Sequence, residues 1–331
     1  MKIKLLTKHA QAEGTGYVPV PMHPGFEYSR STEARGYDWL VAYDEMPKRN
    51  SGTVRHGAET LDCPFEQTLF VAQEPVCVKS YGRDFVRQFG HYLTTREPEA
   101  ENHPNYHLGR GYYETYYGVP LENIGSIDIS KKVNLISTVC SSKQMRHTCH
   151  SKRFALISHL AKTISGFEWY GRGVKSLRLK CESLDTYKYH VAVENYIGKG
   201  HCTEKLIDSI LGECLTFYAG DPDVGTWLPK DSFVPIPLDD HQEAERIIRA
   251  SIEDDLFEKR IGAIKEAKRL ILEKYNFWAQ IIDVIKSAES QQIVPRKSPV
   301  KIKNRHRMRL NPIIAMKDTF THISRALKNL T

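Results

Sequence analysis

Residues 190–220 constrain the fold more than any other part of this chain. The short run 191–193 is apolar and mostly β-branched, which predicts a buried strand that ends at Glu194 and Asn195. After a loop with two glycines, Thr203 is placed to cap a helix with its hydroxyl, and Gly212 ends that helix. The apolar residues of the helix share one face: Leu206, Ile207, Ile210 and Leu211. A second apolar run follows at 214–218, so the stretch predicts a right-handed βαβ unit of a parallel sheet.

Polar residues gather where an open α/β sheet binds its ligands, at the carboxyl end of the strand and the amino end of the helix. They are Glu194, Asn195, His201, Glu204 and Lys205. Free backbone amides and the helix dipole favour an anion at this place. Lys205 places a positive charge at the positive end of the helix dipole, which is unfavourable for the helix alone. A phosphate or diphosphate bound between the lysine and the helix end would explain this arrangement. We therefore predict a nucleotide site in which Glu204 binds sugar or ribose hydroxyls and His201 contacts the base.

The run from Glu194 to Lys205 resembles the donor-binding motif of the α-1,3/4-fucosyltransferases (glycosyltransferase family 10, bacterial type), which reads Phe-Glu-Asn, a short loop and Tyr-Val-Thr-Glu-Lys. Here Glu-Asn is followed by five residues and then by His-Cys-Thr-Glu-Lys. Segments 217–220 and 228–233 resemble that family's next strand and its Leu-Pro-x-x-Ser-Phe segment, so the resemblance covers roughly fifty residues. Three positions depart from the pattern: Val193 replaces phenylalanine, Tyr196 replaces serine or threonine, and His201 replaces tyrosine.

The resemblance implies an α/β fold of two Rossmann-like domains facing a cleft, the GT-B type. It also implies inverting transfer from GDP-fucose as the donor substrate, with no cofactor and no metal, because protein cations and a helix terminus neutralise the diphosphate. Asp221-Pro222-Asp223 has the Asp-x-Asp pattern that holds a metal in other glycosyltransferases, but it follows Gly220 in what is predicted to be a turn. We therefore assign no residue to a metal site.

Two apolar runs in the first part of the chain end in polar residues. Residues 39–43 end at Asp44, and residues 68–72 lead to Glu74 and then to Pro75, which ends the strand. An inverting transfer needs a carboxylate that takes the proton of the acceptor hydroxyl, and a partly buried glutamate does this near neutral pH. The resembling family has its catalytic glutamate after a comparable strand, so we predict Glu74 as the general base. The alternative is a surface glutamate that follows a strand.

A second α/β domain is predicted to begin near residue 131, with a strand at 133–139, a helix at 151–164 and a further strand at 167–170. In the resembling family, an arginine of this helix contacts the diphosphate. Arg153, Lys152 and Lys143 compete for that role here, and those that do not fill it only solvate a helix end. The predicted donor site therefore adds Arg153 and Lys152 to the residues of the βαβ unit.

The net charge of +7 is concentrated at the end of the chain. Residues 296–331 hold ten lysines and arginines against one acid, a charge of +9, which leaves −2 for the first 295 residues. This argues against a globular body that binds nucleic acid. Residues 313–330 have an amphipathic pattern, and a basic amphipathic tail is typical of attachment to an anionic membrane surface; bacterial fucosyltransferases often carry such a tail. The alternatives are a tail that binds RNA or a protein partner, and a disordered tail.

No apolar run is long enough to span a bilayer, and the first residues lack the apolar segment of a signal peptide. The seven cysteines lack the spacing of a zinc site and are interpreted as free thiols of a reducing compartment. These features predict a cytoplasmic protein, with peripheral attachment to the inner face of the plasma membrane through the tail.

The sequence thus predicts three parts. They are an acceptor-binding α/β domain at 1–130, a nucleotide-sugar-binding Rossmann-like domain with closing helices at 131–287, and a basic amphipathic tail at 288–331. The predicted function is metal-independent, inverting transfer of L-fucose from GDP-fucose to a hydroxyl of an oligosaccharide, a lipopolysaccharide or another glycoconjugate. The alternatives are a glycosyltransferase that uses another nucleotide sugar, and a non-catalytic nucleotide-binding protein whose tail binds membrane or RNA.

Overall fold

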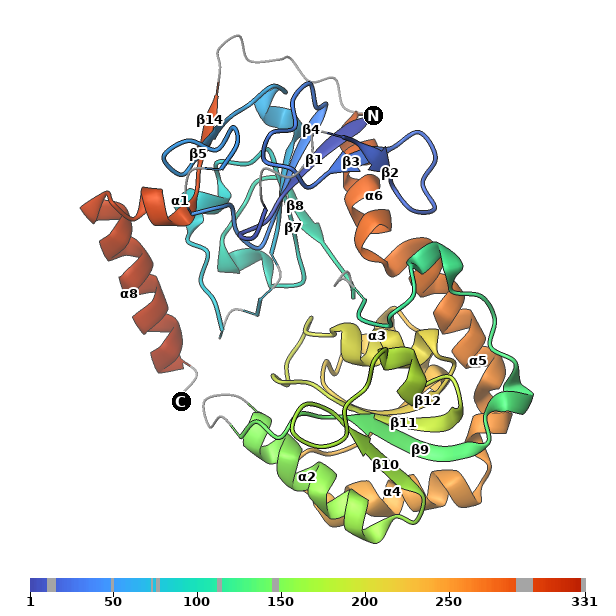
Figure 1. The fold of residues 1–331 in the computed structure, drawn as a ribbon. Helices are drawn as coiled ribbons and strands as arrows, with labels where there is room; N and C mark the ends of the chain where they lie inside the picture. The colour runs from blue at the N-terminus through green and yellow to red at the C-terminus, as the bar shows by residue number, and fades with distance from the viewer. Residues whose placement is uncertain are drawn as a thin grey trace. The chain divides into compact units, whose positions relative to one another are not determined.

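The chain forms two compact units, Met1–Gly109 with Trp278–Thr331, and Arg110–Phe277 (Figure 1). The structure is a computed structural model, and it describes all residues except 11–15, 49–50, 73, 76–77, 112–114, 145–148, 290–299 and 329–331. Of residues 321–328 it describes the backbone only.

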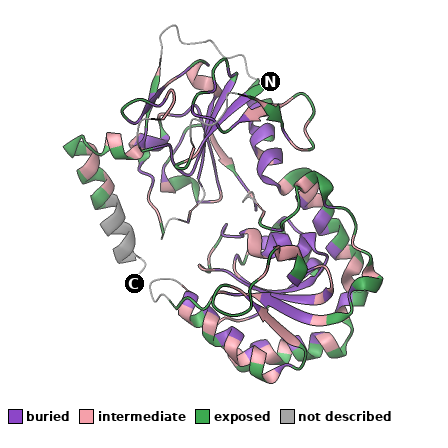
Figure 2. Cartoon of the chain, in the orientation of Figure 1, coloured by how far each residue is buried: buried purple, intermediate pink, exposed green. Residues whose placement is uncertain are grey.

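The first unit is built on a seven-stranded sheet with the order β2-β3-β1-β4-β6-β7-β8. Every pair in it is parallel except β2 with β3. The strands are β1 (Lys2–Leu6), β2 (Val18–Pro19), β3 (Glu27–Ser29), β4 (Trp39–Tyr43), β6 (Thr68–Val71), β7 (His91–Thr94) and β8 (Tyr106–Leu108). Every residue of β4 and β6 is buried, as in a parallel sheet covered on both faces (Figure 2). Strands β2 and β3, of two and three residues, are too short to show a period in the sequence.

The second unit is built on a five-stranded, fully parallel sheet with the order β10-β9-β11-β12-β13. The strands are β9 (Asn134–Val139), β10 (Phe167–Tyr170), β11 (Tyr187–Val193), β12 (Leu215–Ala219) and β13 (Phe233–Pro235). The helices are α2 (His150–Thr163), α3 (Glu204–Leu211), α4 (His241–Glu253) and α5 (Leu256–Leu270), followed by a π-helical turn, η8 (Ile271–Tyr275). The predicted βαβ unit is therefore β11, α3 and β12, with β11 beginning four residues earlier than predicted.

Helices cover both faces of this second sheet. On one face, the apolar side of α3 packs with residues of α5, and the predicted residues Leu206, Ile207, Ile210 and Leu211 are all buried. On the other face, α2 and α4 form a second core with the opposite side chains of β11 and β12. The carboxyl ends of β11 and β12 carry the loops that lead into α3 and out of β12, so this edge of the sheet positions the candidate site.

Shorter elements complete the two units. The first unit also contains β5 (Ala58–Thr60), α1 (Arg83–Val86), α6 (Phe277–Glu289), β14 (Lys301–Lys303), α7 (Arg305–Met308) and α8 (Pro312–Lys328). Short 3₁₀ helices lie at Phe65–Gln67, Pro98–Ala100, Leu121–Asn123, Ile129–Lys131, Lys180–Ser183, Val224–Thr226 and Lys230–Ser232. Of the helices in the described part of the chain, none combines the length and the apolar character needed to cross a membrane.

The division into units differs from the predicted boundaries at both ends of the second domain. The second unit begins at Arg110 rather than near residue 131, because Tyr117 is buried in its core beside Leu184. Residues from Trp278 onward return to the first unit. The predicted tail is part of that return: β14 pairs antiparallel with β5, and its central residue, Ile302, is fully buried. The sequence does not indicate this strand, because a single isoleucine between two lysines gives no apolar pattern within the basic run.

Candidate functional site

A buried carboxylate joins the end of β11 to the start of α3. Glu194 is fully buried, and its oxygens accept hydrogen bonds from the backbone N–H of Thr203 at 2.8 Å and from the Thr203 hydroxyl at 2.7 and 2.8 Å. Thr203 occupies the N-cap position, as predicted, but its hydroxyl donates to Glu194 and makes no capping bond to the helix amides. Glu194 therefore links the end of β11 to the start of α3 through its hydrogen bonds with Thr203.

Lys205 lies between two carboxylates in the first turn of α3. Its Nζ is 3.1 Å from Glu194 Oε2 and 3.0 Å from Glu204 Oε1, and it donates to the Thr203 hydroxyl at 2.9 Å. Burial alone would lower the pKa of Lys205, but the two carboxylates raise it overall. Burial alone would raise the pKa of Glu204, but the charges of Lys205 and Lys180 lower it overall. Both groups are therefore charged at neutral pH.

Arg153 is the best placed of the three competing cations. It is buried, its Nη1 donates to Asn195 Oδ1 at 2.5 Å and to the Val193 carbonyl at 3.4 Å, and its Nε has no partner among the described residues. The backbone N–H of Cys149, the N-cap residue of α2, donates to the Asn195 carbonyl at 2.9 Å. The end of β11 and the start of α2 are thus tied together around the Arg153 guanidinium.

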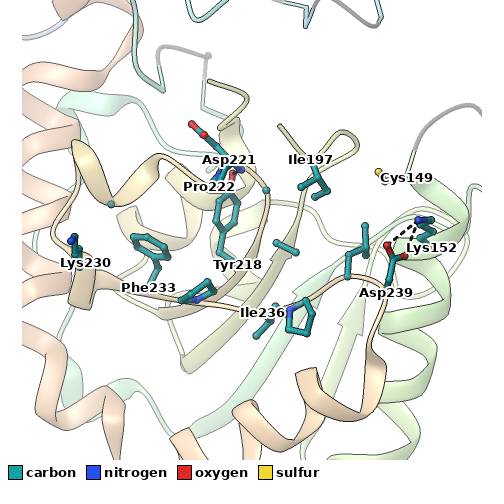
Figure 3. A pocket seen from close by; sticks show the side chains of 16 residues that line it. Cys149, Lys152, Ile197, Tyr218, Asp221, Pro222, Lys230, Phe233, Ile236 and Asp239 are labelled. Carbon is teal, nitrogen blue, oxygen red and sulfur yellow. Dashed lines mark hydrogen bonds and ion pairs between the residues drawn. The ribbon is translucent and has the colours of Figure 1, made fainter. Parts of the chain in front are cut away.

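The two other cations are more exposed. Lys152 forms an ion pair with Asp239, with 2.9 Å between Nζ and Oδ1 (Figure 3). Lys143 is exposed in the segment after β9. Neither side chain is brought to Asn195 by a described hydrogen bond, so Arg153 is the one that the structure joins to the predicted site.

His201 is buried in the loop between β11 and α3. Its ring lies edge-on to that of Tyr196, with 5.6 Å between the centroids, and burial lowers its pKa although Glu194 opposes the shift. Gly200, just before it, has a left-handed backbone with φ of 73°, which a glycine adopts without strain. A neutral imidazole beside an aromatic ring therefore stands where the resembling family has tyrosine.

Three polar residues that the sequence did not single out belong to this site. Lys180 donates to Asp208 Oδ2 at 2.8 Å and to the Glu204 carbonyl at 3.2 Å. Burial raises the pKa of Asp208 to about 6, although Lys180 opposes the shift. The Tyr218 hydroxyl lies 3.5 Å from Glu194 Oε1 and accepts from the Asp221 backbone N–H at 3.1 Å. Tyr218 falls in the segment that resembles the family's next strand, whereas no sequence pattern marks Lys180.

Glu74 lies at the carboxyl edge of the sheet of the first unit, after β6. Its backbone N–H donates to the Tyr81 hydroxyl at 3.1 Å, which in turn donates to Asp44 Oδ1 at 2.5 Å. Its carbonyl accepts two bonds from the Arg96 guanidinium, at 2.9 and 2.5 Å. Asp44 follows β4 and Arg96 follows β7, so three neighbouring strands fix the backbone of Glu74.

The Glu74 carboxylate itself accepts no hydrogen bond from the described residues. Burial raises its pKa, and the negative charge of Asp44 adds to the shift. Lys79 opposes it, but the Lys79 ammonium is already bonded to Asp44 Oδ1 at 2.9 Å. A half-buried carboxylate with a raised pKa and a fixed backbone suits a general base.

The Asp221-Pro222-Asp223 segment forms a turn, as predicted. Asp221 is buried, and its Oδ1 accepts from the backbone N–H of Asp223 at 2.9 Å, so the first carboxylate closes the turn. In the part of the chain that the structure describes, no group of three or more histidine, cysteine, aspartate or glutamate side chains is arranged to hold a metal ion. Metal independence stays a prediction that a chelator tests.

The fold resembles that of solved glycosyltransferases. No family model matches the sequence, and no curated protein matches it. Three crystal structures of alpha1,3-fucosyltransferase, of which one is with GDP and another with GDP-fucose, are 16%, 16% and 15% identical to this chain, with TM-scores of 0.51, 0.50 and 0.52. They cover 90%, 83% and 90% of this chain and 92%, 84% and 92% of their own. At this identity the likeness shows the fold, and it confirms the predicted pair of Rossmann-like α/β units of the GT-B type.

Proposed function

We propose that this protein is an inverting, metal-independent glycosyltransferase that transfers L-fucose from GDP-fucose to a hydroxyl of an oligosaccharide or glycoconjugate. One observation carries the proposal: the buried Arg153 guanidinium, with one nitrogen unpartnered, lies at the carboxyl end of β11 next to the starts of α2 and α3. An anion is favoured there by the helix termini and by the guanidinium. The solved alpha1,3-fucosyltransferase structures of the same fold, with GDP and with GDP-fucose, favour a guanosine diphosphate sugar as that anion.

The proposed reaction needs one proton acceptor and one site for a leaving diphosphate. The acceptor hydroxyl gives its proton to Glu74 as its oxygen attacks the anomeric carbon of fucose. The bond between that carbon and the phosphate oxygen breaks with inversion, and GDP leaves with the electron pair. Arg153, Lys205 and the two helix termini stabilise the charge that develops on the diphosphate.

The remaining predicted residues receive roles from their surroundings. Asn195 orients Arg153 through its side-chain oxygen, and Glu204, held beside Lys205, accepts hydroxyls of the sugar or ribose. His201 contacts the nucleotide from the loop. Glu194 acts through Thr203 and Lys205 rather than on the donor, because its carboxylate is fully buried.

The direct test of this function is release of GDP from GDP-fucose in the presence of an acceptor panel and a chelator. We expect acceptor-dependent GDP release that the chelator does not reduce. Transfer only from another nucleotide sugar would favour the alternative donor, for which the histidine at position 201 is the structural argument. Tight donor binding without any transfer would favour a non-catalytic nucleotide-binding protein.

The pH dependence of transfer is expected to report the raised pKa of Glu74. The base works when deprotonated, so kcat/KM falls as pH falls through that pKa, at a pH above the range of an exposed glutamate, about 4.3. Asp44→Asn removes a negative neighbour and keeps the oxygen that accepts from Tyr81, so the acid limb moves to lower pH. The measurement is a pH profile of kcat/KM for both proteins, with Glu97→Gln, an exposed glutamate, as the control. An acid limb that stays in place would show that Asp44 does not act on the base.

Membrane attachment through α8 is a separate part of the proposal. Ile313, Met316 and Phe320 are spaced on one helical face, and 60%, 67% and 76% of their areas are exposed. The basic residues that precede the helix favour an anionic surface. We therefore expect binding to anionic vesicles and weaker binding to neutral ones.

Removing apolar side chains from α8 is expected to weaken vesicle binding. The double variant Met316→Ser/Phe320→Ser loses two buried contacts with the lipid, which predicts at least about tenfold weaker binding. Co-sedimentation with vesicles measures it, and Val133→Ser, which removes an 80% exposed apolar residue of the second unit, is the control. Equal binding by all three proteins would rule out α8 as the attachment site.

A further inference from the structure

A cavity of about 660 Å³ lies within the second unit, at the carboxyl ends of β12 and β13 (Figure 3). Its walls include Ile197 from the loop before α3, Tyr218 at the end of β12, and Phe233 and Ile236 in and after β13. The rings of Tyr218 and Phe233 meet edge to face, with 6.2 Å between their centroids. A cavity of this volume with mostly apolar walls suits a flat, ring-shaped part of a small ligand.

The cavity adjoins the proposed diphosphate site. Cys149, the N-cap residue of α2, and Lys152, in its first turn, line the cavity, and Arg153 is the residue after Lys152. Ile197 lies in the same loop as Asn195, the residue to which Arg153 donates. A nucleotide whose diphosphate lies against Arg153 therefore has this cavity beside it for its base.

Two charged side chains at the cavity place a hydrogen-bond donor, the Lys152 ammonium, next to a hydrogen-bond acceptor, the Asp239 carboxylate. Lys152 Nζ lies 2.9 Å from Asp239 Oδ1 and 3.0 Å from Oδ2, and both side chains are more than half exposed, at 57% and 69%. Asp221, the other carboxylate of the lining, is already used by the backbone of its own turn. Lys152 and Asp239 are thus the pair that a base in this cavity meets.

We propose that this cavity binds guanine, with Asp239 accepting from N1–H and from the 2-amino group while Lys152 donates to O6. This inference rests on the proposed function, since it assumes a guanosine diphosphate sugar. Guanine presents two adjacent N–H donors beside a carbonyl, which a carboxylate next to an ammonium matches with two parallel bonds. Adenine presents a ring nitrogen acceptor to the carboxylate, and uracil has a single N–H between two carbonyls. Asp239 therefore selects the base, and Lys152 acts on the base rather than on the diphosphate.

Inosine diphosphate provides the test, because it differs from GDP only in lacking the 2-amino group. Calorimetric titration of the full chain with each nucleotide is expected to show GDP binding about tenfold more tightly than inosine diphosphate. In Asp239→Ala this ratio falls to about one. In Lys152→Met both nucleotides bind more weakly and the ratio is kept, because both carry O6. Asp254→Ala, an exposed aspartate outside the cavity, keeps the affinities of the original protein.

The outcomes separate this inference from the proposed function. GDP binding with the same ratio in Asp239→Ala, or a ratio near one in the original protein, overturns the guanine cavity and leaves the donor site standing. Binding of neither nucleotide overturns the donor site and the cavity together. Both variants change exposed side chains, so a folded protein is expected in each case.

Discussion

Glu74→Gln is expected to slow glycosyl transfer by about 10²–10⁴-fold and to leave donor affinity unchanged. Glutamine has almost the same shape but cannot take a proton from the acceptor hydroxyl. The backbone bonds that place residue 74, to Tyr81 and Arg96, involve only its N–H and carbonyl, so the substitution does not disturb them. The predicted loss is therefore confined to the chemical step.

Single-turnover transfer rates and donor titration, measured on the same preparation, check this result. Glu99→Gln, at an exposed glutamate of the same unit, is the matched control and is expected to keep the full rate. Undiminished transfer by Glu74→Gln would exclude Glu74 as the base and would leave it a surface glutamate that follows a strand.

Lys205→Ala is expected to lose transfer by at least about 10²–10³-fold, because a cation that stabilises the leaving diphosphate is gone. It is also expected to destabilise the protein by about 3–5 kcal/mol, since removing one partner of a buried ion pair leaves the other charge uncompensated. Solvent cannot compensate the unpaired charge of Glu194, because that side chain is fully buried. Activity and stability therefore fall together in this variant.

A double variant separates the two effects of Lys205. Glu194→Gln/Lys205→Met removes both charges of the pair, so much of the stability should return, measured as the urea midpoint, while transfer stays lost. Lys175→Ala breaks an exposed pair with Glu168 and is expected to leave the urea midpoint almost unchanged. Transfer restored in the double variant would mean that Lys205 serves only to balance Glu194, and turnover like that of the original protein in Lys205→Ala would remove the diphosphate assignment.

Much of the second unit could be predicted because its signals are local. A β-branched run before Glu194, an apolar helical face and Gly212 lie within thirty residues, and they specify β11, α3 and β12 without knowledge of the rest. The sequence placed Tyr117 in the first domain, and it did not place the residues from Trp278 onward there. Both predictions differ from the structure because the residues that these segments pack against are far away in the sequence. Burial of Ile302 within the first unit is decided by the pairing of β14 with β5, about 240 residues earlier.

The residues of the candidate sites also fall into two groups, those that are close together in the sequence and those that only the fold brings together. Asn195, Glu204 and Lys205 follow one another within a single loop and helix start, so their grouping is visible in the sequence. Asp44, Tyr81 and Arg96 meet around Glu74 only because parallel strands end at one edge of the sheet. The contacts of Glu194 with Thr203 and Lys205 also depend on the fold, since the sequence does not show that this carboxylate is fully buried.

The central claim is that the second unit binds a guanosine diphosphate sugar without metal. Calorimetric titration with GDP, GDP-fucose, GDP-mannose and UDP-galactose, with chelator present throughout, tests it most directly. We predict tight binding of GDP and GDP-fucose, weaker binding of GDP-mannose and none of UDP-galactose. Binding that requires restored metal, binding of the UDP compound alone, or no binding of any of the four would contradict the claim.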